Sequence, residues 1–199
     1  MRKQDAVSAP EVIVHLLPGG KMPERQTVGA IGYDVYLRAI VSPSEMDPEN
    51  PRLRKTLFDF LHLPHDPAVA AHVIAQPNKS GDMVLAYRLD PMESVLVGIG
   101  FITAMPFPLF YWVAPRSGLA SRWGITVTNA PGTVDPDYRG EAGVLVYNRN
   151  DRPFMLQKDM RIAQIVFQWA VIPEFRTVAE FNQIPQTTRG AGGFGSTGL

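Results

Sequence analysis

The segment from Arg189 to Leu199 is the part of the chain best equipped for binding chemistry. It holds five glycines, one arginine, one phenylalanine and two hydroxyl side chains. Glycines free the backbone to curl its N–H groups around an anion, and the guanidinium of Arg189 presents a planar fork to phosphate oxygens. Ser196 and Thr197 add hydroxyl donors, and the ring of Phe194 can stack on a base. This composition predicts binding of a nucleoside polyphosphate.

A P-loop is the first alternative for this segment. Gly190 and Gly195 have the spacing of a Walker A loop, and Thr197 stands at its hydroxyl position. However, Ser196 replaces the lysine that reaches the outer phosphates, so the sequence argues against a P-loop enzyme. A disordered terminal tail is the plain alternative, and the motifs upstream decide against it.

The composition bounds the protein class. A chain of 199 residues with 45% hydrophobic content predicts a single domain, 1–199, with a real core. The formal net charge is +0, so bulk attraction to nucleic acid or to an anionic membrane is not expected. The chain has no cysteine, which excludes disulfides and thiolate metal sites and suits a reducing compartment. No apolar run is long enough to span a bilayer. We therefore expect a cytoplasmic protein with no nucleic-acid or membrane partner.

The four histidines lie at or before His72. Chemistry in the C-terminal half would therefore depend on carboxylates and a metal ion for proton transfer.

The sequence predicts an all-β fold. Short apolar or β-branched runs, separated by glycine, proline and asparagine, predict a barrel or sandwich. The predicted strands are 12–17, 33–39, 83–89, 94–101, 109–114, 126–129, 142–148, 154–156 and 161–170. A short helical turn is predicted at 118–123.

One segment, 43–81, departs from the strand pattern. Leu53, Leu57 and Leu61 are spaced by four residues, and Asp66 before Pro67 is typical of a helix start. We expect a small helical insertion in the β domain. Its three histidines have no spacing that would place them on one helix face, which favours surface positions over a metal site.

Five short blocks follow one another along the chain. They are Gly32 to Asp34, Pro115 to Ala120, Asn129 to Glu141, Arg161 to Gln164, and Arg189 to Gly198. In this order they strongly resemble the motifs of the trimeric dUTP diphosphatase (dUTPase) family, from about residue 12 to the C-terminus without 43–81.

The resemblance implies a distorted, jelly-roll-like β-barrel and hydrolysis of dUTP to dUMP and diphosphate. It further implies dependence on Mg²⁺ and a homotrimer with shared active sites, in which 187–199 forms a flexible lid. The first, second and fourth blocks would come from one subunit, the third block from another, and the lid from the remaining subunit.

The resemblance also assigns roles to residues. Arg116, Ser117 and Gly118 would hold the α- and β-phosphates, at a turn where a guanidinium, a hydroxyl and backbone N–H groups can converge. Asp34 and Gln164 would line the phosphate site and support the outer shell of Mg²⁺, which would have no direct protein ligand. Arg161 would anchor the fourth block through an ion pair.

In the third block, Asn129 and the Gly132 backbone would recognise uracil by hydrogen bonds, because an amide offers both an acceptor and a donor. Tyr138 would lie against deoxyribose and leave no room for a ribose 2′-hydroxyl. Asp135 would contact the 3′-hydroxyl and orient the attacking water. Thr133 completes the substrate-binding set of this block.

The catalytic set is Asp135, Arg189 and Ser117. Water held by Asp135 would attack the α-phosphorus, while Arg189 and Ser117 stabilise the developing charge. Phe194 would stack on uracil as the lid closes, with Gly195, Ser196 and Thr197 on the phosphates.

The fourth block departs from the family pattern at the turn before it. A glycine commonly precedes this block, whereas Lys158, Asp159 and Met160 stand here. The geometry of that turn is therefore open.

Two other functions remain open on the sequence. The related dCTP deaminases share the fold, but they need a glutamate on the strand after the third block, where this chain has Leu145. A nucleotide-sensing regulatory protein that binds a partner through the 43–81 insertion is the second alternative.

Overall fold

The computed structural model describes residues 9–78 and 80–192. Within these ranges the chain forms fourteen strands, two short α-helices and one 3₁₀ turn. The strands are β1 (Ile13–Leu16), β2 (Tyr33–Tyr36), β3 (Ala39–Met46), β4 (Arg54–Phe58), β5 (Val73–Pro77), β6 (Met83–Leu89), β7 (Ser94–Gly98), β8 (Phe101–Ala104), β9 (Leu109–Pro115), β10 (Ile125–Val127), β11 (Gly132–Val134), β12 (Gly143–Asn148), β13 (Phe154–Gln157) and β14 (Arg161–Trp169). The helices are α1 (Pro67–Ala70) and α2 (Ser117–Trp123), and the 3₁₀ turn η1 is Phe181–Gln183. The all-β prediction is confirmed, and so is the helical turn at 118–123.

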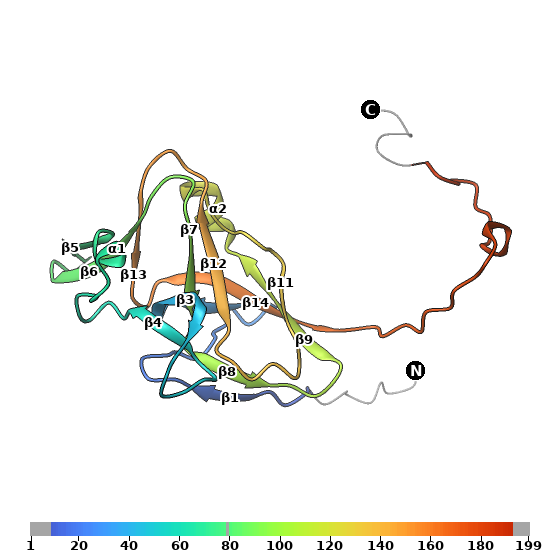
Figure 1. The fold of residues 1–199 in the computed structure, drawn as a ribbon, viewed down its shortest axis with the longest axis horizontal. Coiled ribbons are helices and arrows are strands. Elements are labelled where there is room, and N and C mark those ends of the chain that lie inside the picture. The colour runs from blue at the N-terminus through green and yellow to red at the C-terminus, as the bar shows by residue number, and fades with distance from the viewer. Residues whose placement is uncertain (1–8, 79, 193–199) are drawn as a thin grey trace.

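The strands form four antiparallel sheets (Figure 1). Their strand orders are β1-β8, β10-β12-β7-β3-β4, β11-β9-β14-β2 and β13-β6-β5. The sheets wrap a common core, and the described strands do not close into a hydrogen-bonded barrel. One predicted strand, 94–101, is split into β7 and β8 at Gly100, whose φ of +79° turns the chain where it packs on Gly20.

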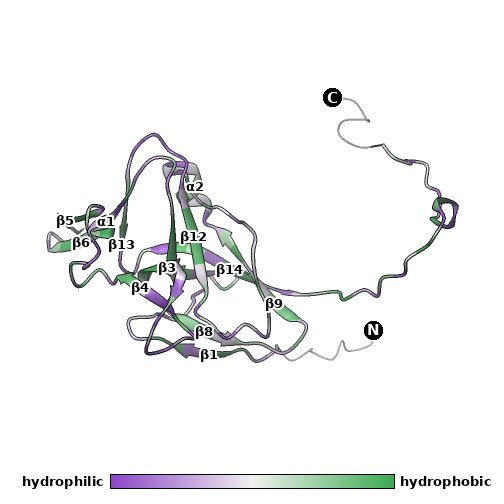
Figure 2. Ribbon diagram, in the orientation of Figure 1, coloured by the Kyte–Doolittle hydropathy of each residue, from purple (hydrophilic) through white to green (hydrophobic). Residues whose placement is uncertain are grey.

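Alternation of side chains builds the core. Along β12, residues Val144 and Val146 are buried while their neighbours are half-exposed, which is the period of two expected of a strand. Tyr111 on β9 and Phe101 on β8 are among the largest fully buried side chains. Figure 2 shows the matching hydropathy, with hydrophobic strands such as β9 and β6 and a β4 that is hydrophilic at its start and hydrophobic at its end.

The helical insertion predicted at 43–81 is wrong. This segment contains the second half of β3, all of β4 and β5, and a single helix of four residues, α1. The two buried residues near its middle are Phe58 and Phe60, two positions apart, and their rings pack 4.5 Å apart. Pairing of β4 with β3 outweighs the four-residue leucine spacing, and Leu61 is exposed. The predicted helix start does hold, because Asp66 accepts a hydrogen bond from the N–H of Ala68.

Beyond Trp169 the chain leaves the body of the molecule (Figure 1). We call residues 170–192 the C-terminal arm. The arm contains η1 and several exposed apolar side chains. No helix among the described residues is long and apolar enough to cross a membrane.

Candidate active site

A hollow of about 470 Å³ gathers residues of the first, second and fourth sequence blocks. We call it the Arg116 hollow. Its lining includes Gly32 and Asp34 from the first block, Arg116 to Gly118 from the second, and Gln164 from the fourth, together with Gln26 and 29–31.

Strand β14 explains why three distant blocks meet there. In its antiparallel ladders, Gln164 lies opposite Asp34 on β2 and opposite Ala114 on β9. Arg116 follows β9 directly and is the N-cap residue of α2. The sheet register therefore places all three blocks at one end of these strands.

The side chain of Arg116 is held rigidly. Its Nε donates to Oδ1 of Asp34 at 2.9 Å and its Nη2 donates to Oδ2 at 3.2 Å, a bidentate ion pair. Its Nη1 donates to the carbonyl of Arg161 at 3.1 Å. A guanidinium has five N–H donors, so these three contacts with described residues leave two donors for a ligand in the hollow.

Asp34 is 8% exposed and holds two arginines. Arg161 also donates to Oδ2 of Asp34 at 3.2 Å and to Oε1 of Gln26 at 2.6 Å. Both carboxylate oxygens of Asp34 are thus engaged by guanidinium groups, which fits an organising role better than direct metal binding.

The amide of Gln164 is also fixed. Its Nε2 donates to the carbonyl of Pro115 at 3.0 Å, and a Cβ at Gly32 would overlap its Oε1. Glycine at position 32 therefore leaves room for the Gln164 carbonyl oxygen, which is an acceptor beside the hollow.

The third block lies elsewhere in the same chain. Strand β11 pairs with β9 so that Gly132 lies opposite Val113 and Val134 opposite Tyr111. Asp135, which follows β11, is exposed and lines two other hollows, beside Phe107 and Pro136. At about 3.4 Å per residue along β9, Asp135 and Arg116 are on the order of 20 Å apart. One chain does not bring them together.

The hairpin of the third block is closely packed around its glycines. A Cβ at Gly132 would lie 3.1 Å from Nδ2 of Asn129, while a Cβ at Gly140 would overlap the hydroxyl of Tyr138. That hydroxyl donates to the carbonyl of Glu141 at 3.1 Å. Asn129 and Thr133 are exposed.

The base of this hairpin is tied to the core by an ion pair that sequence reasoning missed. Glu141 is 3% exposed. Its Oε1 accepts hydrogen bonds from Nε of Arg38 at 2.7 Å and from the N–H of Gly100 at 2.8 Å, and its Oε2 accepts one from Nη2 of Arg38 at 2.6 Å. Gln26 of the Arg116 hollow was missed as well. It stands in an irregular loop, so no pattern in the sequence marks it.

The turn before β14 is formed without glycine. Asp159 has a φ of +65°, the left-handed conformation that glycine would favour there. Aspartate tolerates this conformation better than most residues, and its carboxylate pairs with Lys21 at 3.0 Å. The substitution therefore preserves the turn.

The remaining predicted residues belong to the C-terminal arm and beyond. Arg189 is exposed, and its Nε donates to the carbonyl of Gly192 at 2.8 Å. The C-terminal arm that carries it runs away from the body of the molecule (Figure 1), and Arg189 is not among the residues that line the Arg116 hollow. Phe194, Gly195, Ser196 and Thr197 lie outside the described residues.

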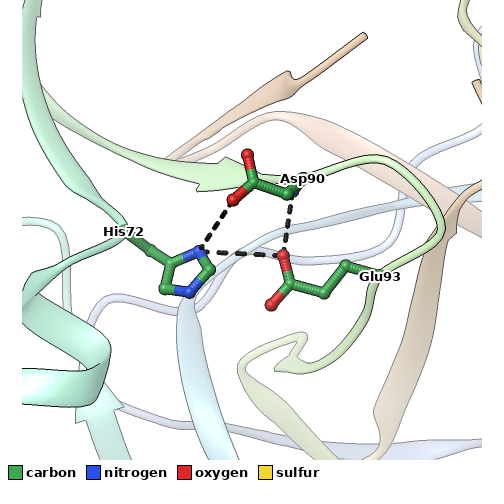
Figure 3. Close-up of side chains that lie close together, drawn as sticks. All are labelled: His72, Asp90 and Glu93. Carbon is green, nitrogen blue, oxygen red and sulfur yellow. Dashed lines mark hydrogen bonds and ion pairs between the residues drawn. The ribbon is translucent and has the colours of Figure 1, made fainter. Parts of the chain in front are cut away.

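A second polar cluster lies outside this site. His72, Asp90 and Glu93 converge within the described chain, with Nδ1 of His72 at 4.0 Å from Asp90 and 3.7 Å from Glu93 (Figure 3). However, Nδ1 is 2.9 Å from the carbonyl of Arg88 and must donate to it. The Arg88 guanidinium already binds both oxygens of Asp90 at 2.9 and 3.1 Å. A bound cation would have to displace these partners, so the contacts are those of a structural cluster.

Tyr87 supports that cluster. Its ring stacks on His72 at 5.1 Å with an interplanar angle of 7°. Burial, together with Glu93 and Asp90, raises the pKa of Tyr87 to about 12. The phenol is therefore neutral at physiological pH and serves as a packing partner.

Comparisons with known proteins agree on one family. Residues 82–198 match the sequence model of the dUTPase family. A deoxyuridine 5′-triphosphate nucleotidohydrolase of Rhizobium rhizogenes is 50% identical over 111 residues, covering 56% of this chain and 69% of that protein. The protein of the same name from Heliobacterium modesticaldum is 36% identical over 190 residues, covering 94% of this chain and 95% of the relative.

A solved structure resembles the whole fold. The dUTPase of Staphylococcus bacteriophage 80alpha with dUPNHPP aligns at a TM-score of 0.64 and 20% identity, covering 95% of this chain and 99% of the phage protein. At this identity the likeness supports the fold.

Proposed function

The chain belongs to the dUTPase family and acts as a dUTP diphosphatase, and we propose that three copies build each active site together. One observation carries the proposal. Asp34, Arg116 and Gln164 share one hollow, whereas Asp135 stands at the other end of β9. A water molecule held by Asp135 and a phosphate held by Arg116 must be adjacent for hydrolysis. A neighbouring copy can supply the Asp135 hairpin that the hollow lacks.

Uracil is recognised by the hairpin of the third block. The amide of Asn129 lies directly against Gly132, where any larger residue would crowd it. An amide side chain beside an accessible backbone offers both a donor and an acceptor, which can pair with the acceptor and the donor on the edge of uracil. Cytosine has its donor and acceptor in exchanged positions, so the same groups would not pair with it. Leaving buried polar groups unpaired with the wrong base makes such a site selective.

The sugar and the attacking water meet the same hairpin. The ring of Tyr138 is fixed by its hydroxyl contact with Glu141 and by its packing on Gly140. A rigid ring against deoxyribose leaves no space for a 2′-hydroxyl. The exposed carboxylate of Asp135 orients water toward the α-phosphorus and accepts its proton.

The phosphates lie in the Arg116 hollow. The two uncommitted N–H groups of Arg116 bind phosphate oxygens, and Ser117 adds a hydroxyl. Because Asp34 fixes the guanidinium before substrate arrives, little reorganisation is needed as charge develops.

Mg²⁺ is the expected cofactor, and the residues of the hollow fit an indirect role. Asp34 has both oxygens occupied by arginines, while the Oε1 of Gln164 is an acceptor at the hollow. A magnesium ion keeps several waters and prefers substrate phosphates. Gln164 and Asp34 would hold those waters, and the ion would neutralise phosphate charge.

Arg189 and the segment after it complete the site as a lid from a further copy. Arg189 adds a second guanidinium to the phosphates, and Phe194 covers uracil with Gly195, Ser196 and Thr197 on the phosphates. We also propose a cytoplasmic location, which the absence of cysteine suits.

Two experiments test the proposal. Diphosphate release should be rapid from dUTP with Mg²⁺ and weak from dCTP or dTTP, and ammonia release from dCTP would instead support a deaminase. Copies carrying Arg116→Ala and Asp135→Asn, each inactive alone, should regain part of the activity when unfolded together and refolded as mixed assemblies. If the mixture stays inactive, the shared site is refuted.

A further inference from the structure

A second hollow, of about 460 Å³ and mostly apolar, adjoins the Arg116 hollow. We call it the apolar hollow. Its wall includes Val12, Met22, Ile31, Tyr33, Leu109 and Phe167. Ala30 and Ile31 line both hollows, so the two share a wall. Met22 is 52% exposed and Ile31 is 77% exposed. Open apolar surface of this kind marks a binding groove.

The C-terminal arm carries apolar side chains that its own copy leaves uncovered. Phe181 and Ile184 are 77% and 48% exposed. Phe181 begins η1 and Ile184 is the C-cap residue of this formed turn. The Gln183 side chain accepts from Glu180 N–H at 3.2 Å, and Ile184 N–H donates to the carbonyl of Phe181 at 3.1 Å. A preformed turn loses less conformational entropy when it binds.

We propose that this turn docks in the apolar hollow of a second copy of the chain and anchors the lid there. The inference rests on the proposed function, in which Arg189 reaches the Arg116 hollow of another copy. Ile184 precedes Arg189 by five residues, which can span at most about 18 Å. Because the hollows share a wall, a turn seated in one places Arg189 within reach of the other. The arm of Figure 1 runs away from its own body, which favours a second copy as the host.

Anchoring would make lid closure easier. Without it, about 20 residues between Trp169 and Arg189 must be ordered as one loop, and with it about five remain. Loop-closure cost falls by about 0.6 kcal/mol for each halving of length, so two halvings favour the closed lid about eightfold.

Cysteine cross-linking tests the docking directly, since the natural chain has no cysteine to interfere. The test protein carries Asn182→Cys, in the turn, and Met22→Cys, on the rim of the apolar hollow. The control protein pairs Asn182→Cys with Met83→Cys, an exposed residue on β6. Mild oxidation should give covalent dimers and trimers on a denaturing gel for the first pair and far fewer for the second.

The other outcomes contradict the proposal. A faster-migrating, internally closed monomer would place the turn in its own hollow. Equal cross-linking of both pairs would show an arm without a docking site, and no cross-linking would show that the turn does not visit the hollow. These readouts do not depend on hydrolysis, so an inactive protein that cross-links as expected would refute the proposed function alone.

A kinetic test uses matched arm variants. Phe181→Ser should lower kcat/KM for dUTP about eightfold by loss of the anchor. Phe175→Ser makes the same change six residues earlier, on a side chain that is 94% exposed, and should have little effect. Equal losses in both variants would overturn the specific role of the turn.

Discussion

Asp34 forms a bidentate ion pair with the Arg116 guanidinium, in which Nε donates to Oδ1 at 2.9 Å and Nη2 donates to Oδ2 at 3.2 Å. The two residues are far apart in sequence. They meet because β2 and β9 lie on either side of β14 in one sheet. In the proposed active site, Asp34 would therefore act on the reaction through the arginine. It fixes the direction in which the two remaining N–H groups of Arg116 point.

Asp34→Asn should impair hydrolysis without removing any group that contacts substrate. The neutral amide cannot accept both guanidinium contacts, so Arg116 loses its fixed orientation. Misplacement of about 1 Å costs on the order of 100-fold in rate. Steady-state kinetics should show this fall in kcat/KM, and circular dichroism should show the fold retained. An unchanged kcat/KM would mean that Arg116 needs no such support.

Gly32→Ala should displace the side chain of Gln164, because the added Cβ overlaps Oε1. We expect weaker Mg²⁺-dependent activity, measured as a rise in the Mg²⁺ concentration that gives half-maximal rate. The double variant Gly32→Ala with Gln164→Ala should be no worse than Gln164→Ala alone. If the two effects simply add, the clash with Gln164 is not the cause.

Asp135→Asn should nearly abolish turnover and leave nucleotide binding largely intact. The amide keeps the size of the carboxylate but is a poor base, so a loss of about 10²- to 10⁴-fold in kcat is expected. Calorimetry with a non-hydrolysable dUTP analogue should give a Kd close to that of the natural protein. A large loss of affinity would assign Asp135 to binding instead.

Truncation after Thr188 should remove most catalysis and preserve the folded body. The C-terminal arm is exposed throughout its last part and adds no residue to the core. Thermal unfolding should therefore show a nearly unchanged Tm, while diphosphate release falls sharply. Normal turnover by the truncated protein would refute the lid.

The pH dependence of stability should include a contribution from Asp59. Burial raises its pKa, but hydrogen bonds from the His62 ring and from the N–H groups of His62 and Leu61 outweigh that effect and lower the pKa to about 2. A lowered pKa in the folded state stabilises the protein above pH 3.8, the ordinary value, and this contribution is lost as the pH falls toward 2.

Urea unfolding of the natural protein and of Asp59→Asn tests this. The difference between their free energies of unfolding should be largest above about pH 4 and should shrink between pH 4 and 2. A difference that stays constant over this range would contradict the role of Asp59.

The sequence by itself determined the strand-rich class and the identity of the chemical groups. Short apolar runs mark strands such as β6, predicted and found at 83–89, because such a run and the turn residues that bound it are local properties of the sequence. The five blocks could be identified because their residues and their order resemble the motifs of the dUTPase family. The same local reasoning failed at 43–81, where a four-residue leucine spacing predicted helix and pairing of β4 with β3 produced strand.

The tertiary structure alone decided which of these groups meet. Strand register brings Asp34, Arg116 and Gln164 into one hollow and keeps Asp135 at the far end of β9. It also commits three N–H groups of Arg116 and leaves the other two without a partner among residues 9–78 and 80–192. Such pairings join residues far apart along the chain. They depend on how the strands pack, which no local pattern records.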